Sequence, residues 1–249
     1  MIPKGLLIGL IGLCAAGVYA DSLIVVTYNI HHGEGRDKKI DLERIAGVLE
    51  GMHPDILCLQ EVDRHLSRTG RQDFPAWFAQ RLHMAVAYGV NYRVDNGEYG
   101  VATLSRFPIT AEETLPLPTP PGKETRGCLI TTIDWKGTAL TVLNTHLGLD
   151  ETQRKDQVQA LLSHIPAEGA VLLAGDLNAK PDAPAIAPLF GRFTDSLPRE
   201  APATVGSGRI DYIFVSPALT VRSAAVIKTP MTQQASDHLP VCVALEMKK

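Results

Sequence analysis

Residues 171–178 read Val-Leu-Leu-Ala-Gly-Asp-Leu-Asn, an apolar run that ends in a carboxylate and an amide. The apolar part is typical of a strand buried on both faces of a sheet, so Asp176 and Asn178 would lie where that strand meets a loop. Charged groups are costly to bury unless they are paired or bound to a metal. Similar ends recur, and we expect the strands to bring them to one edge of the fold; the others are Asn29, Gln60-Glu61, Asn144-Thr145-His146, Asp211 and Asp237-His238.

Runs rich in Val, Ile, Leu and Thr alternate with helical patterns, which predicts an α/β fold with mixed sheets flanked by helices. We expect helices from Leu42 to Met52 behind an N-cap at Asp41, from Asp73 to about His83, and around Val158. A hairpin is expected at 134–137, and the proline-rich residues 105–127 read as a surface loop. Strands are expected at 23–30, 55–60, 85–92, 100–104, 128–134, 138–144, 170–174, 210–215, 221–227 and 241–246.

The first twenty residues are typical of a signal peptide that is cut after Ala20. Lys4 supplies the positively charged n-region, and residues 5–18 form the apolar stretch. That stretch is short for a membrane span, which needs about 20 apolar residues; an uncleaved anchor is the alternative. We therefore expect a leader over 1–20, a single domain over 21–249, and a periplasmic or secreted protein.

The composition is that of a packed globular protein, with 45% hydrophobic and 20% charged residues in a chain of 249. The chain has 24 Lys+Arg against 27 Asp+Glu, a net charge of −3. This balance disfavours tight, non-specific binding to nucleic acid. After the leader, three cysteines remain at 58, 128 and 242, each in an apolar run. An odd number of this kind predicts buried, inert thiols.

The polar strand ends are rich in oxygen donors and contain no sulfur. Such donors suit a hard cation, Mg²⁺ or Mn²⁺, and not zinc. His146 and His238 add protonatable groups. A cation, acids and imidazolium together are equipped to hydrolyse a phosphate ester by in-line attack of an activated water. The oxygen donors are Asn29, Glu61, Asp176, Asn178, Asp211 and Asp237.

Six short motifs surround the polar strand ends. They are Thr27-Tyr28-Asn29-Ile30, Leu59-Gln60-Glu61-Val62, Asn144-Thr145-His146-Leu147, Gly175-Asp176-Leu177-Asn178-Ala179, Arg209-Ile210-Asp211-Tyr212-Ile213-Phe214 and Ser236-Asp237-His238-Leu239-Pro240. In this order they resemble the motifs of the endonuclease/exonuclease/phosphatase superfamily, and the resemblance covers residues 23–245. It implies a four-layer α/β sandwich, two mixed β-sheets packed face to face and flanked by helices, with a catalytic site at one end.

The resemblance implies a role for each matching residue. Glu61 would be the principal metal ligand, with Asn29 and Asp237 close to the ion. Asp176 would orient or deprotonate the attacking water, helped by Asn178. The catalytic set would be completed by His238 at the scissile phosphate, its carboxylate partner Asp211, and His146 at a phosphate oxygen or the leaving group.

Each motif taken alone also has an ordinary structural explanation. Asp176 and Asn178 could form an Asx turn, Asp237 could cap a short helix, and Glu61 could be a solvated strand end. The agreement of all the motifs favours the catalytic interpretation.

The string Tyr28-Asn29-Ile30-His31-His32-Gly33 is similar to a bacterial branch related to the lipid-remodelling domain of GPI-anchor enzymes, as is Glu98-Tyr99-Gly100. Val101 departs from this branch, whose members often carry Asn there. Adjacent strand residues point to opposite faces, so we expect the His31-His32 pair to face substrate rather than to share one ion. Arg126 is either a phosphate clamp or an ordinary surface arginine. The substrate-contacting set is predicted as His31, Tyr99, Arg126 and Asn144.

The substrate is less determined than the reaction. A phospholipid or inositol-phosphate head group is favoured by export and by the branch resemblance, with transient contact to a membrane surface. DNA or RNA cleavage by a secreted nuclease is the alternative that the charge disfavours. A binding module that kept the fold and lost catalysis is a third reading, which the intact acids argue against. We expect a monomer.

Overall fold

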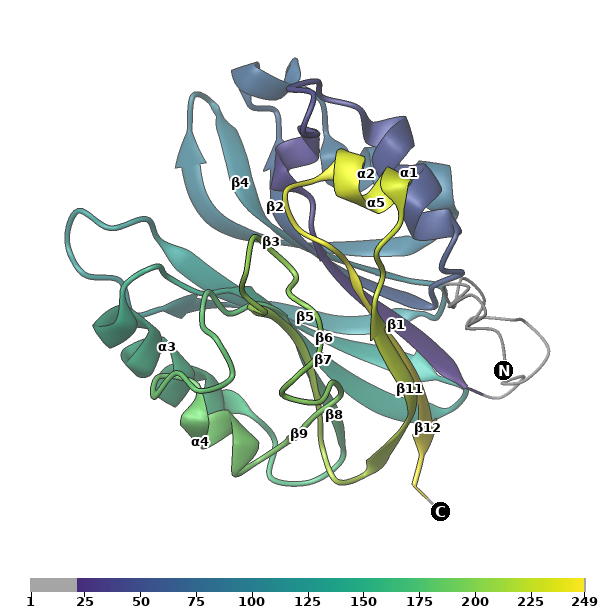
Figure 1. The fold of residues 1–249 in the computed structure, drawn as a ribbon, viewed down its shortest axis with the longest axis vertical. Helices are drawn as coiled ribbons and strands as arrows, with labels where there is room; N and C mark the ends of the chain where they lie inside the picture. Colours follow the sequence, from purple (N-terminus) through teal and green to yellow (C-terminus); the bar gives the residue numbers. More distant parts are fainter. Residues whose placement is uncertain (1–21, 249) are drawn as a thin grey trace, which may run out of the picture.

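The computed structural model describes residues 22–248, and the leader expected over 1–20 lies outside them. Two mixed sheets of six strands each form the centre of the fold (Figure 1). The first sheet has the order β11 (Leu219–Val226), β12 (Val241–Met247), β1 (Leu23–Asn29), β2 (Ile56–Arg64), β4 (Gly97–Ser105) and β3 (Ala85–Val94). The second has the order β5 (Ile109–Leu117), β6 (Arg126–Trp135), β7 (Thr138–His146), β8 (Ala170–Asp176), β10 (Asp211–Val215) and β9 (Thr194–Asp195).

Helices cover the outer face of each sheet. The parallel pairs β1–β2 and β7–β8 each need a helical crossover, and α1 and α3 supply them. The helices are α1 (Leu42–Glu50), α2 (Phe74–Leu82), α3 (Glu151–His164), α4 (Ala187–Phe190) and α5 (Pro230–Ala235), with short 3₁₀ turns η1 (His31–Gly33) and η2 (Ser67–Thr69). None of the helices in residues 22–248 has the length and hydropathy needed to cross a membrane.

Buried side chains sort into three layers because neighbouring strand residues face opposite ways. Val26 and Leu57 pack with α1 and α2, whereas Val25 and Ile56 pack against the other sheet. Leu173 faces away from the first sheet, towards α3 and α4. The result is helices, sheet, sheet and helices, so the four-layer α/β sandwich is confirmed.

Local signals placed most elements correctly. Asp41 and Asp73 cap α1 and α2 by accepting hydrogen bonds from Arg44 N (2.9 Å) and Ala76 N (3.0 Å). The expected hairpin joins β6 to β7. The cysteines at 58, 128 and 242 are buried and form no disulfide within residues 22–248, and burial raises the pKa of Cys58 to about 12, which makes it inert.

The prediction of a surface loop over residues 105–127 was wrong in part. Residues Ile109–Leu117 form β5, which pairs only with β6 and therefore lies at the edge of its sheet. Proline is tolerated on an edge strand because its missing N–H faces away from the ladder, and Pro116 lies opposite Gly127. The two-residue strand β9 was also not expected.

Candidate active site at one end of the sandwich

The polar strand ends meet at one end of the sandwich because the strand registers bring them there. Asn29 lies opposite Gln60 where β1 pairs with β2. Asp176, at the end of β8, lies between His146 of β7 and Asp211 of β10. Residues that are far apart in sequence are thus neighbours across adjacent strands, as the pattern of strand ends predicted.

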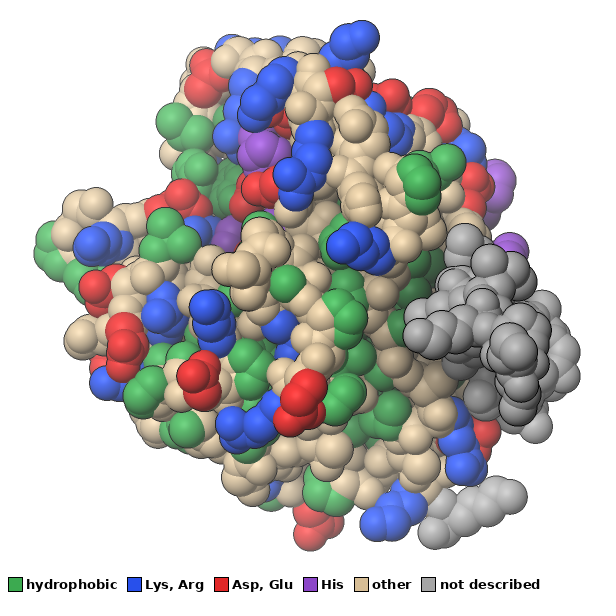
Figure 2. Space-filling view, in the orientation of Figure 1, with side chains coloured by type: hydrophobic (Ala, Val, Ile, Leu, Met, Phe, Trp, Pro, Cys, Tyr) green, Lys and Arg blue, Asp and Glu red, His purple; other side chains and the backbone are tan. Residues whose placement is uncertain are grey.

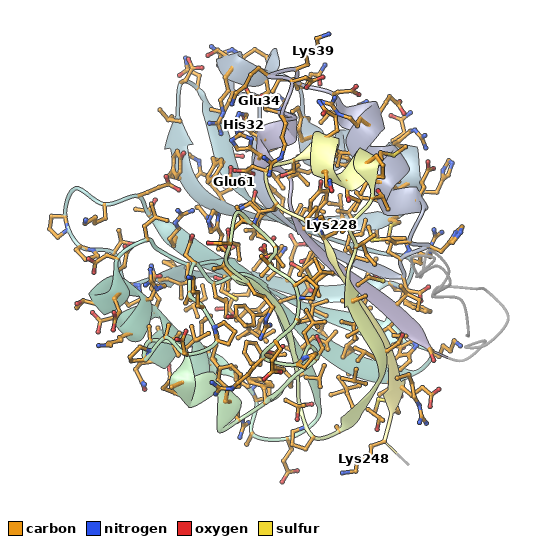
Figure 3. The ribbon with its side chains drawn as sticks, viewed as in Figure 1. His32, Glu34, Lys39, Glu61, Lys228 and Lys248 are labelled. Carbon is orange, nitrogen blue, oxygen red and sulfur yellow. The ribbon has the colours of Figure 1, made fainter. Side chains whose placement is uncertain are left out.

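A break in β2 places Glu61. Its φ of 57° is left-handed, and the register of β2 against β4 shifts between Leu59 and Val62. A bulge re-aims a side chain, and a left-handed conformation at a residue other than glycine costs about 1–3 kcal/mol. Glu61 lies below His32 in Figure 3, and Figure 2 shows acidic and histidine side chains gathered on this part of the surface.

The Asn29 amide connects two acids. Its Nδ2 donates to Glu61 Oε1 (2.9 Å) and to Asp176 Oδ2 (3.1 Å). Burial alone would raise the pKa of Glu61. The neighbouring His32 and the Asn29 amide outweigh burial and hold that pKa well below its ordinary value. Glu61 is therefore an anion at neutral pH.

Asp176 is a buried acid close to two histidines. Its Oδ2 lies 3.5 Å from His146 Nε2 and 3.7 Å from His238 Nε2. Burial, together with the neighbouring Asp211, raises the pKa of Asp176 to about 7. A carboxylate that titrates near neutrality is suited to accept a proton from water.

His238 and Asp211 form a buried ion pair. The imidazole Nδ1 lies 2.9 Å from Asp211 Oδ2 and 3.2 Å from Oδ1. Burial opposes the charged form of His238, but the Asp211 carboxylate outweighs burial and raises the pKa of the imidazole to about 10. His238 is therefore cationic at neutral pH, beside the acid that would activate water.

His146 is a neutral imidazole, in contrast to the cationic His238. Arg126 Nη1 lies 3.1 Å from His146 Nδ1, and burial followed by this guanidinium lowers the pKa of His146 to about 3. Arg126 was predicted as a phosphate clamp or a surface arginine. It is instead buried, and it contacts His146 and Glu124 Oε1 (2.8 Å).

Asn178 fixes the loop that carries Asp176. Its backbone N–H donates to Asp176 Oδ1 (2.9 Å), and its Nδ2 donates to Leu147 O (2.9 Å). The Asx turn considered from the sequence is therefore present, within the site rather than apart from it.

Asp237 lies at the rim, with a side chain that is 45% exposed. Ser236 Oγ lies 2.8 Å from Asn29 O and 3.3 Å from Asp237 Oδ1. His238 N donates to the same hydroxyl (3.2 Å). Ser236 thus secures the loop before β12 to the end of β1.

The oxygen donors of the site fit a divalent cation. Donor atoms of Asp176, Asp211 and His238 lie within 4.8 Å of one another, and because the protonated His238 cannot be a ligand, only the carboxylate oxygens of this group could contact a metal ion. Buried acids need a positive partner, and His238 is one cation for two of them. Glu61, bridged to Asp176 through Asn29, adds a further deprotonated carboxylate. Oxygen donors of this kind are those that Mg²⁺ and Mn²⁺ prefer.

The His31 and His32 rings do not point to opposite faces, so that part of the expectation was wrong, whereas the substrate contact predicted for His31 stays a prediction. The two residues follow β1 in η1, with φ values of 47° and 42°. Their ring centroids lie 4.5 Å apart, and both rings reach Glu61. A left-handed turn has replaced the alternation of a strand.

Asn144 does not face substrate. Its Nδ2 donates to Ala102 O (2.9 Å) and Leu59 O (3.3 Å), and its Oδ1 accepts from Gln60 Nε2 (2.8 Å). The side chain is fully buried and uses its hydrogen-bonding capacity between the two sheets. The prediction of a substrate contact here was wrong.

Tyr99 lies beside the site and is mostly buried. Its ring lies 4.9 Å from that of Tyr92, and Arg68 lies over it at 5.5 Å. Burial, and then the charge of Glu61, raises its pKa well above the ordinary value. The predicted substrate contact at Tyr99 stays a prediction.

Sequence reasoning gave no role to two residues that organise the site, Gln60, which was among the expected strand ends, and Ser236. Both are polar residues next to a predicted ligand, at the end of an apolar run or at the start of a loop. Their signal was therefore present, but nothing in the sequence showed that they bond to Asn144 and to the Asn29 backbone.

Residues 26–238 match the model of the Endonuclease/Exonuclease/phosphatase family. The chain is 28% identical over 247 residues to the uncharacterized protein YbhP of Escherichia coli K12, covering 91% of this chain and 97% of that protein. An endonuclease/exonuclease/phosphatase from Beutenbergia cavernae has a similar structure, with a TM-score of 0.78, 27% identity and coverage of 91% and 72%. The human Nocturnin catalytic domain, solved with a bound sulfate anion, has a TM-score of 0.76, 24% identity and coverage of 91% and 94%.

Proposed function

The chain belongs to the endonuclease/exonuclease/phosphatase family, whose members are generally metal-dependent phosphoesterases and nucleases, and on this premise we propose that it hydrolyses a phosphodiester or a phosphomonoester. The observation that carries the proposal is the juxtaposition of Asp176 with a cationic and a neutral histidine. A buried acid between such groups suits the activation of water next to a phosphate.

In this proposal each side chain has a separate role. Glu61, with Asn29 and Asp237, would hold Mg²⁺ or Mn²⁺, which supplies Lewis-acid stabilisation of phosphate charge. Asp176 accepts the proton of the attacking water. The cationic imidazole of His238 stabilises the charge that develops on the phosphate oxygens.

His146 would hydrogen-bond a phosphate oxygen or the leaving group. A guanidinium has only donors, so the contact with Arg126 requires His146 Nδ1 to accept. The imidazole proton is therefore on Nε2, the nitrogen that lies nearest to Asp176. His146 can then donate without carrying a charge.

For the substrate we propose a phospholipid or inositol-phosphate head group. Three residues beyond His146, Leu149 has 76% of its surface exposed. A single exposed leucine is ordinary on a protein surface, so the lipid assignment is supported by the expected export and by the branch resemblance, and Leu149 serves as the residue with which membrane contact is probed. The net charge of −3 disfavours the nuclease alternative. That alternative is favoured by a structural neighbour, D. rerio TDP2, which was solved with a single-strand DNA product.

The metal is tested with a soluble aryl phosphodiester. Hydrolysis should stop with EDTA and return with Mg²⁺ or Mn²⁺. Asp176→Asn should lower kcat by on the order of 10²-fold or more while the protein stays folded. Turnover that resists chelation would remove the metal from the proposal, and full activity in the variant would remove the role of Asp176.

The substrate is tested with a panel of DNA, RNA, sphingomyelin, phosphatidylinositol and inositol phosphates. Leu149→Ser should lower activity on lipid vesicles and leave activity on the soluble diester unchanged. Strong cleavage of nucleic acid alone would overturn the lipid assignment. Binding of any of these without turnover would favour the inactive module.

Export to the periplasm or medium, and a monomeric state, complete the proposal. The leader-like residues 1–20 support export. Fractionation of expressing cells with N-terminal sequencing tests for a cut after Ala20, and light scattering tests for the monomer. A cytoplasmic protein that retains Met1 would contradict the first, and a stable dimer the second.

A further inference from the structure

A second cluster of donor atoms lies on the η1 side of Glu61. One ring nitrogen of His31, one of His32 and a carboxylate oxygen of Glu61 lie within 4.8 Å of one another. Figure 3 shows His32 and Glu61 close together on this face. The side chains of His31 and His32 are 26% and 16% exposed, so the cluster is recessed but open to small ions.

The backbone at this cluster is strained in each of the three residues. His31, His32 and Glu61 have φ values of 47°, 42° and 57°. Residues other than glycine persist in this region only where their surroundings over-determine it, and such outliers gather at active and ligand sites. Only glycine fits at position 33 of this turn, because its φ is +79° and a Cβ there would lie 3.1 Å from Leu42 Cδ2. The turn brings the two histidines together, and the break in β2 brings Glu61 to them.

The imidazoles have nitrogens available for a ligand. His31 Nδ1 lies 3.2 Å from Glu34 O, and when it donates there His31 Nε2 keeps its lone pair. Metal-bound histidines are commonly oriented by a hydrogen bond of this kind. His32 Nδ1 is buried and has no hydrogen-bond partner within residues 22–248. A buried ring nitrogen without a partner is uncommon, and a bound ion would give it one.

Glu61 presents its two oxygens to different neighbours. Oε1 accepts from Asn29 on the side of Asp176, whereas Oε2 lies 3.8 Å from His32 Nδ1. A carboxylate placed in this way can contribute one oxygen to each of two cations. The first would contact oxygen donors, and the second would contact the histidine pair.

We propose that His31, His32 and Glu61 form a second metal site, which takes a borderline cation such as Zn²⁺ next to the Mg²⁺-type site. Two imidazoles and one carboxylate are a common protein ligand set for Zn²⁺, whereas Mg²⁺ prefers oxygen donors. The inference goes beyond phosphoester hydrolysis and does not depend on it.

The test uses tag-free protein stripped of metal and then saturated with Mg²⁺. Co²⁺ serves as a visible probe for the Zn²⁺ site, and its absorption reports imidazole ligation. Wild-type protein should bind Co²⁺ in the presence of Mg²⁺ and release it to Zn²⁺. His31→Asn and His32→Asn should each weaken Co²⁺ binding at least as much as loss of a group supporting a ligand does, which is about 10- to 100-fold.

The variants are chosen to preserve folding. Asparagine tolerates a left-handed conformation better than most residues, so both should melt like the wild type. His53→Asn is the matched control, because His53 is exposed and also has a positive φ, 49°. It should bind Co²⁺ like the wild type.

Unchanged Co²⁺ affinity in both histidine variants, or a wild-type spectrum without imidazole ligation, would overturn the second site. Asp211→Asn separates this inference from the proposed function, since it should impair hydrolysis and leave Co²⁺ binding intact. If the wild type hydrolyses no phosphoester yet binds Co²⁺ through the pair, the proposed function fails and the metal site stands.

Discussion

Arg126 Nη1 lies 3.1 Å from His146 Nδ1, and this contact assigns the imidazole proton to Nε2 because a guanidinium can only donate. The arginine thus acts on the chemistry through the histidine. It holds His146 neutral and aims its remaining N–H towards Asp176.

Replacing Arg126 should therefore change the protonation of His146. In Arg126→Met, burial still lowers the pKa of the imidazole, but the second cause, the guanidinium charge, is lost. The pKa should rise towards 6.5, and kcat should fall by about tenfold or more. Asp176, with its pKa of about 7, still sets the acid limb of the kcat profile, so the His146 pKa is followed directly by NMR titration of its ring. Arg126→Lys should restore part of the activity, and the exposed Arg93→Met should match the wild type; an unchanged His146 pKa in Arg126→Met would contradict the assignment.

Asp211→Asn should move the basic limb of kcat/KM to lower pH. The carboxylate raises the pKa of His238 to about 10 against the effect of burial, so without it the imidazole loses its proton near or below neutrality.

Asp211→Asn should also weaken the dependence of the free energy of unfolding on pH. In the wild type this pair stabilises the fold fully below pH 6.5, and its contribution is lost as pH rises towards 10. Chemical denaturation across that window should show a smaller decline in the variant; an equal decline would contradict the pairing.

Asp176→Asn should stabilise the metal-free protein although it lowers kcat. The raised pKa means that Asp176 favours folding below pH 3.8, and this contribution is lost as pH rises towards 7. At pH 8 the buried anion is destabilising, and an amide cannot ionise. The Tm of the variant should exceed that of the wild type by roughly 2–4 °C for each kcal/mol recovered. Calorimetry in EDTA measures the Tm of both proteins, and the exposed Glu112→Gln is the control, with an unchanged Tm. A lower Tm in Asp176→Asn than in the wild type would contradict the prediction.

Asn144→Ala should act on stability and not on substrate binding. Truncation removes the hydrogen bonds of Asn144 to the carbonyls of Leu59 and Ala102 and from the Gln60 amide, which still donates to Thr27 Oγ1 (3.0 Å) and Cys58 O (2.9 Å). Loss of such buried bonds costs about 1–3 kcal/mol, whereas KM should stay unchanged. Urea denaturation and steady-state kinetics separate the two effects. The exposed Gln80→Ala should change neither, and a raised KM with normal stability in Asn144→Ala would return this residue to the substrate site.

The polar strand ends could be predicted from the sequence, because the cost of burying a charged side chain and the chemistry of these residue types both indicate a shared site. Asp176 and His238 are costly to bury singly, so apolar runs that lead into such residues indicated a shared site before any coordinates. The conformation of Glu61 was not predictable, since its left-handed φ depends on how β2 meets β4. The prolines of residues 105–127 predicted a loop, but Pro116 lies in β5, an edge strand that tolerates a residue typical of loops.

The His31-His32 pair shows where the alternation of strand side chains between opposite faces ends. Alternation holds through Asn29, the last residue of β1, and the chain then turns into η1. Extending the strand by two residues was enough to send His31 and His32 to opposite faces in the prediction. Only the backbone angles show that the rings lie together.

The pairing of β12 with β1 has a consequence for the timing of synthesis. Asn29 and Glu61 emerge early from the ribosome, but His238 and the strand that anchors its loop come after nearly all other described residues. Until β12 docks beside β1, the chain lacks the imidazolium that the proposed reaction needs. For an exported protein folding follows transport, so competence for the proposed hydrolysis should arise late and abruptly, once β12 has docked.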